Sequence, residues 1–246
     1  MTNSESERSQ IRCARLAGFM YLFVTFIDLL GVYIIGRFQV PGSFAETAQR
    51  IMGSELLYRI GLSCFLIASL CTVFLAMGLY VAVKPINKNL ALLALVFRLV
   101  EATLFGVQSI FSFVVLELYI GADSMNAFNA KQLSVLVNSG SIVGSAGLDI
   151  AMIFFSMGSI LFFYLFFKSH YIPKVLSALG LFGSVLTPIV CFGFLIVPRY
   201  TGILQFGLAP VAIAEILVGL WLLFKGVNLR PRVNGTKDSV AAQSAR

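Results

Sequence analysis

Six long apolar runs constrain the fold of this chain more than any other feature. Each run has 20 residues or more and carries few charged side chains. A helix needs about 20 mainly apolar residues to cross the hydrocarbon core of a bilayer. The runs predict an all-α, polytopic membrane protein built as a bundle of six transmembrane helices. They are Leu16–Ile35, Ile60–Val83, Leu90–Leu118, Ile142–Phe167, Val175–Val197 and Ile203–Phe224.

The composition favours lipid as the solvent and argues against a soluble protein. Hydrophobic residues make up 59% of the chain and charged residues only 12%, whereas a soluble domain is nearer half apolar and about 25% charged. The formal charge is +7, but the basic residues lie between the apolar runs and not in a stretch interleaved with aromatics. We therefore expect the lipid bilayer, and no nucleic acid, as a partner.

The distribution of basic residues predicts the orientation of the helices. Loops that face the cytoplasm carry an excess of Lys and Arg. One set of connections, together with both termini, holds 12 basic residues, whereas the opposite set holds 5 and Arg98 lies within a run. We therefore predict that both termini are cytoplasmic, which agrees with an even number of spans.

The chain is expected to form one membrane domain over residues 12–228. A flexible cytoplasmic N-terminus over residues 1–11 would precede it, and a disordered basic cytoplasmic tail over residues 229–246 would follow it. We interpret the first run as a retained span and not as a signal peptide, because it contains Asp28 and lacks a small-residue cleavage site.

The first outer connection carries a pattern of its own. Ser43 and Glu46 have the spacing of a capping box, which marks the start of a helix. Phe44, Ala48 and Ile51 then recur at helical spacing. We predict a short amphipathic helix that lies on the outer surface or caps the bundle. The second outer connection, residues 121–141, is polar and shows little regular pattern.

Of the six charged side chains inside the apolar runs, four share one layer near the middle of the membrane. A charge at this depth costs at least about 2.5–3.5 kcal/mol, so it needs a partner or water. Counted from the cytoplasmic ends at about 1.5 Å per residue, the four lie roughly 13–20 Å deep. They are Asp28 in the first run, Arg98 and Glu101 in the third, and Glu215 in the sixth.

Polar residues continue from Arg98 along one face of the third helix. Glu101, Gln108 and Ser112 follow at offsets of 3, 10 and 14 residues, which a helix places on the same side. Since a polar stripe in lipid must face other helices or water, we expect it to line the interior. A similar stripe on the first helix consists of Tyr21, Thr25 and Asp28.

Two prolines fall inside the last two runs. Pro188 lies in the fifth run, and Pro210 lies five residues before Glu215 in the sixth. Proline removes a backbone hydrogen bond and frees a carbonyl in the preceding turn. Interrupted helices beside a charged layer are typical of the binding sites of transporters. We therefore expect helix breaks near the charged cluster.

These residues support two main interpretations. In the first, the layer is the binding site of a transport or binding bundle, in which Arg98 holds a small polar or anionic ligand. Glu101 or Glu215 would then take up a proton or cation. In the second, the same charges lock the helix packing of a non-catalytic membrane scaffold or accessory protein.

An intramembrane enzyme is not expected. The single histidine of the sequence is His170, in a short inner turn, where an interfacial role is the simplest interpretation. The sequence contains no nucleophile–histidine pair, no zinc-protease motif and no phosphate-binding loop. We predict no cofactor and no metal site, and the oligomeric state stays open.

Five stretches of the chain form a recognisable series. They are "ARLAGFMYL", "SELLYRIGL", "LYVAVKPINKNLALLALVFRLVEA", "KSHYIPKVLSALG" and "AEILVGLWLLFKGVN". In this order they resemble a bacterial membrane family known as domain of unknown function 4386, from about Arg12 to Asn228. The resemblance implies a single polytopic domain in a bacterial cytoplasmic membrane, and it implies no activity. Its most specific segments hold Arg98, Glu101 and Glu215.

Overall fold

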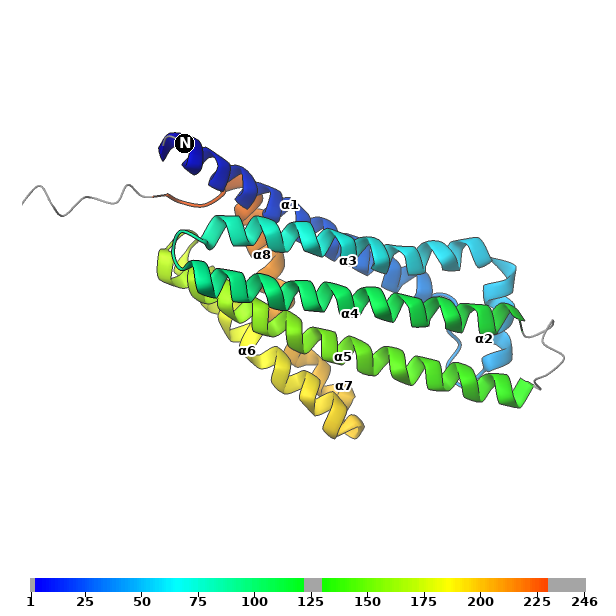
Figure 1. Cartoon of the computed structure of the whole chain (residues 1–246). Helices are drawn as coiled ribbons and strands as arrows, with labels where there is room; N and C mark the ends of the chain where they lie inside the picture. Colours follow the sequence, from blue (N-terminus) through cyan, green and yellow to red (C-terminus); the bar gives the residue numbers. More distant parts are fainter. Residues whose placement is uncertain (1–2, 122–129, 230–246) are drawn as a thin grey trace, which may run out of the picture.

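The computed structural model describes residues 3–121 and 130–229, whose regular secondary structure is helical (Figure 1). The predicted tail, 229–246, lies outside the described residues except for Leu229. The α-helices are α1 (Asn3–Gly36), α2 (Phe44–Gly53), α3 (Glu55–Val83), α4 (Lys88–Ile120), α5 (Ala130–Ser169), α6 (Lys174–Ile196), α7 (Thr201–Leu204) and α8 (Ala209–Lys225). Two 3-10 turns, η2 (Pro198–Tyr200) and η3 (Gln205–Leu208), flank α7.

Six helical segments are long and apolar enough to cross a membrane. This confirms the predicted all-α fold with six apolar spans. Five of the segments belong to α1, α3, α4, α5 and α6, and the sixth runs through η2, α7, η3 and α8.

The six spans form a closed ring in which each packs mainly against two neighbours. The order around the ring is α1, α3, α4, α5, α6 and α8, and α8 returns to pack against α1 (Figure 1). Gly18 of α1 allows this last contact, because a Cβ there would lie 2.7 Å from Gly219 O of α8. Small residues at such positions let helix backbones approach closely.

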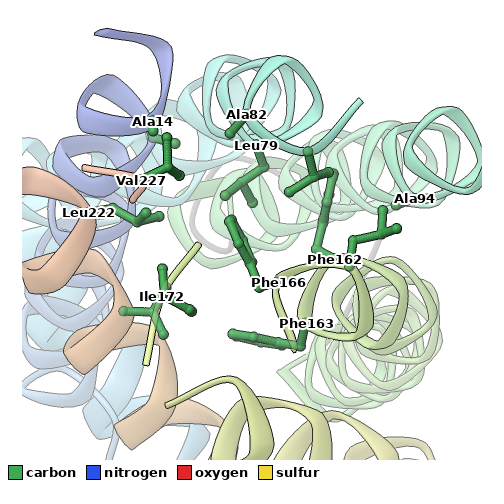
Figure 2. Packing of buried hydrophobic residues seen from close by; sticks show 14 of the residues in the cluster. Ala14, Leu79, Ala82, Ala94, Phe162, Phe163, Phe166, Ile172, Leu222 and Val227 are labelled. Carbon is green, nitrogen blue, oxygen red and sulfur yellow. The ribbon is translucent and has the colours of Figure 1, made fainter. Parts of the chain in front are cut away.

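One end of the ring, the terminal end, is closed by buried apolar side chains. It holds the start of α1, the α3–α4 and α5–α6 turns and the end of α8 (Figure 1). Figure 2 shows three phenylalanines of α5 packed between residues of α3, α4 and α8. The labelled members of this cluster are Ala14, Leu79, Ala82, Ala94, Phe162, Phe163, Phe166, Ile172, Leu222 and Val227.

Short turns at the terminal end have clear local causes. Asn87 caps α4, and its side-chain oxygen accepts hydrogen bonds of 3.1 Å from the backbone N–H groups of Asn89 and Leu90. Pro173 stands at the N-cap of α6, where its missing N–H is no loss. The observed α3–α4 and α5–α6 turns therefore lie within a few residues of the turns predicted from the sequence.

The structure differs from the sequence prediction at the N-terminus. α1 begins at Asn3, so the described part of the predicted flexible segment, residues 1–11, continues the first helix. Gln10 is buried there, and its amide donates a hydrogen bond of 2.5 Å to Ala82 O of α3. This hydrogen bond holds the start of α1 against α3. A hydropathy pattern does not reveal such a contact.

The opposite end of the ring, the α2 end, carries α2. Ser43 caps this helix, since its hydroxyl accepts a hydrogen bond of 3.4 Å from Glu46 N. Ile51 of α2 is fully buried. It belongs to a second apolar cluster with Ile34, Phe38, Tyr58, Leu62 and Leu116. α2 therefore covers the ring where α1, α3 and α4 meet.

α5 extends well past its neighbour α6 toward the α2 end. It starts at Ala130, earlier than the predicted start at Ile142. Leu133 and Val137 are buried on one face of this added part, and their packing extends the helix. α5 has 40 residues and α6 has 23, so α5 projects roughly 25 Å further at about 1.5 Å per residue. Figure 1 shows α6 and α7 diverging from α5 and ending partway along it.

Candidate functional site

A cavity of about 580 Å³ lies inside the ring. Side chains from α1, α3, α4, α5 and α8 line it, whereas α6 contributes none of the described lining residues. The apolar cluster of the terminal end lies below it and α2 lies above it. Its position between two packed ends makes it the natural place for a ligand.

All six of the predicted site residues line this cavity. Arg98, Glu101, Gln108 and Ser112 reach it from α4. Asp28 reaches it from α1, and Glu215 reaches it from α8. The other members of the predicted α1 stripe, Tyr21 and Thr25, line it as well. The structure thus brings together residues from three spans that are far apart in the sequence.

Arg98 and Glu101 form a buried ion pair within α4. Arg98 Nε lies 3.1 Å from Glu101 Oε2, and the two side chains are only 3% and 4% exposed. The pair lacks the alignment of a hydrogen bond, because both of these atoms have no hydrogen-bond partner among the described residues. The two charges offset each other, and polar capacity on both groups is left for a further partner.

Two residues of α5 pack against the Arg98 side chain. The guanidinium lies over the Phe155 ring, with Arg98 Cζ 4.7 Å from the ring centroid. A cation at this distance from an aromatic face is stabilised by the ring's quadrupole. Gly158 makes room for the aliphatic stem, because a Cβ there would lie 2.9 Å from Arg98 Cγ. Sequence reasoning missed both residues, since nothing local indicates which α5 face meets Arg98.

We expect Gly158→Ala to lower the free energy of unfolding by about 1–3 kcal/mol, because the new methyl group overpacks the Arg98 stem. The thermal midpoint in detergent should then fall by roughly 2–4 °C for each kcal/mol lost. Gly147→Ala on the same helix is the matched control, since no atom lies within 4 Å of its Cβ position. Equal midpoints for the two variants would contradict this packing.

Unpaired polar atoms mark the deep part of the cavity. Arg98 Nη1 and Glu215 Oε1 are buried and have no hydrogen-bond partner among the described residues. A buried polar group without a partner costs about 1–3 kcal/mol or more when charged. Such atoms in a cavity wall are the groups that a polar ligand would satisfy.

A hydroxyl of α3 lies next to the ion pair. Ser69 Oγ donates a hydrogen bond of 2.7 Å to Ala102 O, the carbonyl that follows Glu101 in the chain. Ser69 also lines the cavity. It was absent from the predicted site, although a serine in the middle of an apolar run was a visible signal.

Of the two predicted helix breaks, the structure shows an interruption at Pro210 and none at Pro188. Pro188 lies within α6, which continues to Ile196 and does not line the cavity. Pro210 is the second residue of α8, where a missing N–H breaks no helical hydrogen bond. The predicted sixth helix is therefore divided before Pro210. This start of α8 packs against Gly183 of α6, whose Cβ would lie 2.5 Å from Val211 N.

The cavity opens between α1 and α5. Its exposed lining residues lie on α1, on the connection that follows α1, on α5 and on α8, whereas those on α3 and α4 are buried or half-buried. Val32 of α1 is 59% exposed and Leu148 of α5 is 41% exposed. The other exposed lining residues are Gln39, Ser141, Ser145 and Ala212. The opening lies where α6 ends and no longer fills the space beside α5.

Comparison with known proteins places the chain in a family. The profile of the family described as a domain of unknown function, DUF4386, matches residues 16–226. An uncharacterized protein of Archaeoglobus fulgidus is 29% identical over 160 residues, which cover 64% of this chain and 78% of that relative. No solved structure matches the chain. Because the family match takes in all six spans and the whole charged cluster, this chain belongs to the DUF4386 family.

Proposed function

We propose that the protein binds or transports a small polar or charged ligand, an ion or a proton in the central cavity. Arg98, Glu101 and Glu215 form its binding site, and Asp28 lies on the same wall. Gln108 and Ser112 extend the polar face toward the α2 end. In this role Arg98 holds a polar group of the ligand, and a carboxylate takes up a proton or cation. No step of covalent chemistry is required.

The observation that carries this proposal is the set of unpaired polar atoms that face a cavity of about 580 Å³. Ligand sites are concave, mostly apolar and about 300–1,000 Å³ in volume, with a few converging polar groups. Charged groups inside a membrane are costly and are functional by default. A cluster that served packing alone would bury its charges against each other and leave no such space.

The proposed orientation puts the terminal end in the cytoplasm of the cell. Eight basic residues with described positions lie at or near that end: Arg8, Arg12, Arg15, Lys84, Lys88, Lys168, Lys174 and Lys225. The positive-inside rule favours this side as cytoplasmic. The α2 end then faces outward from the cell membrane, with the amphipathic helix α2 as its cap.

A membrane scaffold or accessory protein is the second candidate function. It is favoured by the packing of Arg98, because the aliphatic stem contacts Gly158 and the guanidinium lies over Phe155. These contacts fix α4 against α5. In that case the ion pair specifies helix register, as buried charges do in some proteins. The two functions differ in whether water and solutes reach the cavity.

Cysteine accessibility separates the two functions. After the four native cysteines are replaced, single cysteines are introduced by Ser112→Cys and Ser145→Cys, which both line the cavity. We expect a membrane-impermeant maleimide to label both in intact cells, because the cavity opens toward the α2 end. Val96→Cys is the control, since Val96 is 47% exposed on the outer wall of α4 and does not line the cavity.

The expected result is labelling of the two cavity positions from outside and none at Val96. Absence of labelling from either side of the membrane would overturn the proposed function and support the scaffold. Labelling in inverted vesicles alone would mean that the cavity is accessible to water from the cytoplasmic side, and that the proposed orientation is wrong.

A further inference from the structure

The charged side chains that line the cavity do not balance. Arg98 supplies one positive charge, whereas Asp28, Glu101 and Glu215 are three carboxylates. Arg98 pairs with Glu101 at 3.1 Å. Asp28 and Glu215 have no basic side chain within ion-pair distance among the described residues. The wall therefore carries two carboxyl groups without a basic partner once the ion pair is counted.

The two surplus carboxylates lie close to each other along neighbouring helices. Gly219 of α8 packs against Tyr21 of α1, with its Cβ position 3.0 Å from Tyr21 Cβ. The helices run in opposite directions here, so Glu215 lies about one turn and Asp28 about two turns from this contact, both toward the α2 end. A positive group placed between them would interact with both.

An unpaired carboxylate in this setting favours a cation. Glu215 Oε1 is buried in the cavity wall without a hydrogen-bond or ion-pair partner among the described residues. Ionised carboxylates away from water are very costly unless a positive charge or a metal accompanies them. A ligand with a positive group would supply that charge at the place where it is missing.

The rest of the cavity wall suits a ligand whose body is apolar and packs against aromatic rings. Its apolar lining is contributed largely by Val, Leu, Ile and Phe side chains. Five aromatic residues line the cavity: Tyr21, Tyr58, Phe65, Phe105 and Phe155. Arg98 covers the Phe155 ring, which leaves four further aromatic residues in the lining, and an aromatic ring stabilises a cation that lies over its face.

The opening between α1 and α5 suits the same class of ligand. Val32 and Leu148 on its rim are apolar and exposed. α6 reaches one bilayer thickness, since its 23 residues span about 35 Å. The opening beside its end therefore lies near the membrane surface. An amphiphilic molecule concentrated at that surface meets an apolar rim first and the carboxylates further inside.

We propose that the cavity binds a lipophilic cation, an organic molecule with an apolar body and a positive group that lies between Asp28 and Glu215. This proposal rests on the proposed function, because it names the ligand class of the same site. Arg98 sets the inner limit for the positive group, since its own charge repels that group, and its unpaired Nη1 stays available for a polar atom elsewhere on the ligand. The ligand reaches the site through the opening between α1 and α5.

The test compares two probes of nearly the same size and opposite charge. The full chain is reconstituted into nanodiscs of neutral phosphatidylcholine, and binding of tetraphenylphosphonium and tetraphenylborate is measured by equilibrium dialysis against empty nanodiscs. We expect saturable binding of the phosphonium cation and none of the borate anion. Glu215→Gln and Asp28→Asn should each weaken cation binding at least about tenfold, because each removes one nearby opposite charge.

The matched control is Asp149→Asn, which removes a carboxylate from a spanning helix at a position that does not line the cavity. It should leave cation binding unchanged. Asp28 and Glu215 lie on different helices, so Asp28→Asn keeps the test decisive if Glu215→Gln does not fold. Tighter binding of the anion, or cation binding that neither substitution weakens, would overturn the proposal.

Failure of this inference can be told apart from failure of the proposed function. If the cysteine at position 112 is labelled but the cation does not bind saturably, the cavity is accessible and its ligand is not a lipophilic cation. If that cysteine is not labelled and the cation does not bind, the cavity is closed and both proposals fall.

Discussion

Arg98→Met is expected to lower the free energy of unfolding by about 3–5 kcal/mol. Breaking a buried ion pair by removing one partner leaves an uncompensated charge in a medium of low polarity. Arg98 is 2% exposed and Glu101 is 3% exposed, so little water can solvate the carboxylate in place of the lost guanidinium. The substitution also removes the cation from the Phe155 face. Unfolding by SDS in mixed micelles, followed by circular dichroism, would measure the loss.

The double variant Arg98→Met, Glu101→Met should recover more than half of that loss. Replacing both members of a buried pair by apolar side chains of similar volume is often neutral or stabilising. Full recovery is not expected, since the cavity keeps the carboxyl groups of Asp28 and Glu215 and loses the basic residue of its described lining. A double variant as unstable as the single one would mean that Arg98 does not compensate Glu101.

Gly18→Leu is expected to have the second large effect, a loss of at least about 3 kcal/mol or failure to fold. Overpacking a tight contact costs about 1–3 kcal/mol and occasionally more. At this position the added Cβ would collide with backbone atoms of α8, at Leu223 N and at Gly219 O, and backbone cannot rotate away as a side chain can. The α1–α8 contact that closes the ring would separate.

Gly36→Leu is the matched control for this substitution. Gly36 ends the same helix, and no atom lies within 4 Å of its Cβ position. The thermal midpoint of Gly36→Leu in detergent should stay within a few degrees of the parent protein. A Gly18→Leu variant that is as stable as Gly36→Leu would show that α1 and α8 are not in close contact.

The spans could be predicted from the sequence because each is a local property of the chain. The α3–α4 turn illustrates this, since Asn87 caps α4 and the predicted boundaries at Val83 and Leu90 lie close to the observed ones. The division of the sixth run could not be predicted in the same way. Pro210 indicates a break within residues 203–224, but hydropathy does not report where the backbone changes from 3-10 turns to an α-helix.

The candidate site was predictable only in part. The stripe from Arg98 to Ser112 follows from helical periodicity, and burial of charge follows from its cost in lipid. Which helix meets that stripe is a tertiary property. Phe155 and Gly158 could therefore not be predicted as part of the site. Phenylalanine and glycine are common in membrane helices, and their contact with Arg98 exists only once α5 packs against α4.

The unequal lengths of the helices have a consequence for the bilayer around the protein. α6 spans about 35 Å and α5 about 60 Å, so the lipids of the surrounding annulus meet walls of different height on different sides of the ring. A hydrophobic helix that exceeds the local hydrocarbon thickness tilts or thickens the bilayer beside it. Hydrophobic mismatch of this kind sorts proteins among membranes. We therefore expect bilayer thickness, which acyl-chain length sets, to affect the tilt of α5 and the width of the opening beside it.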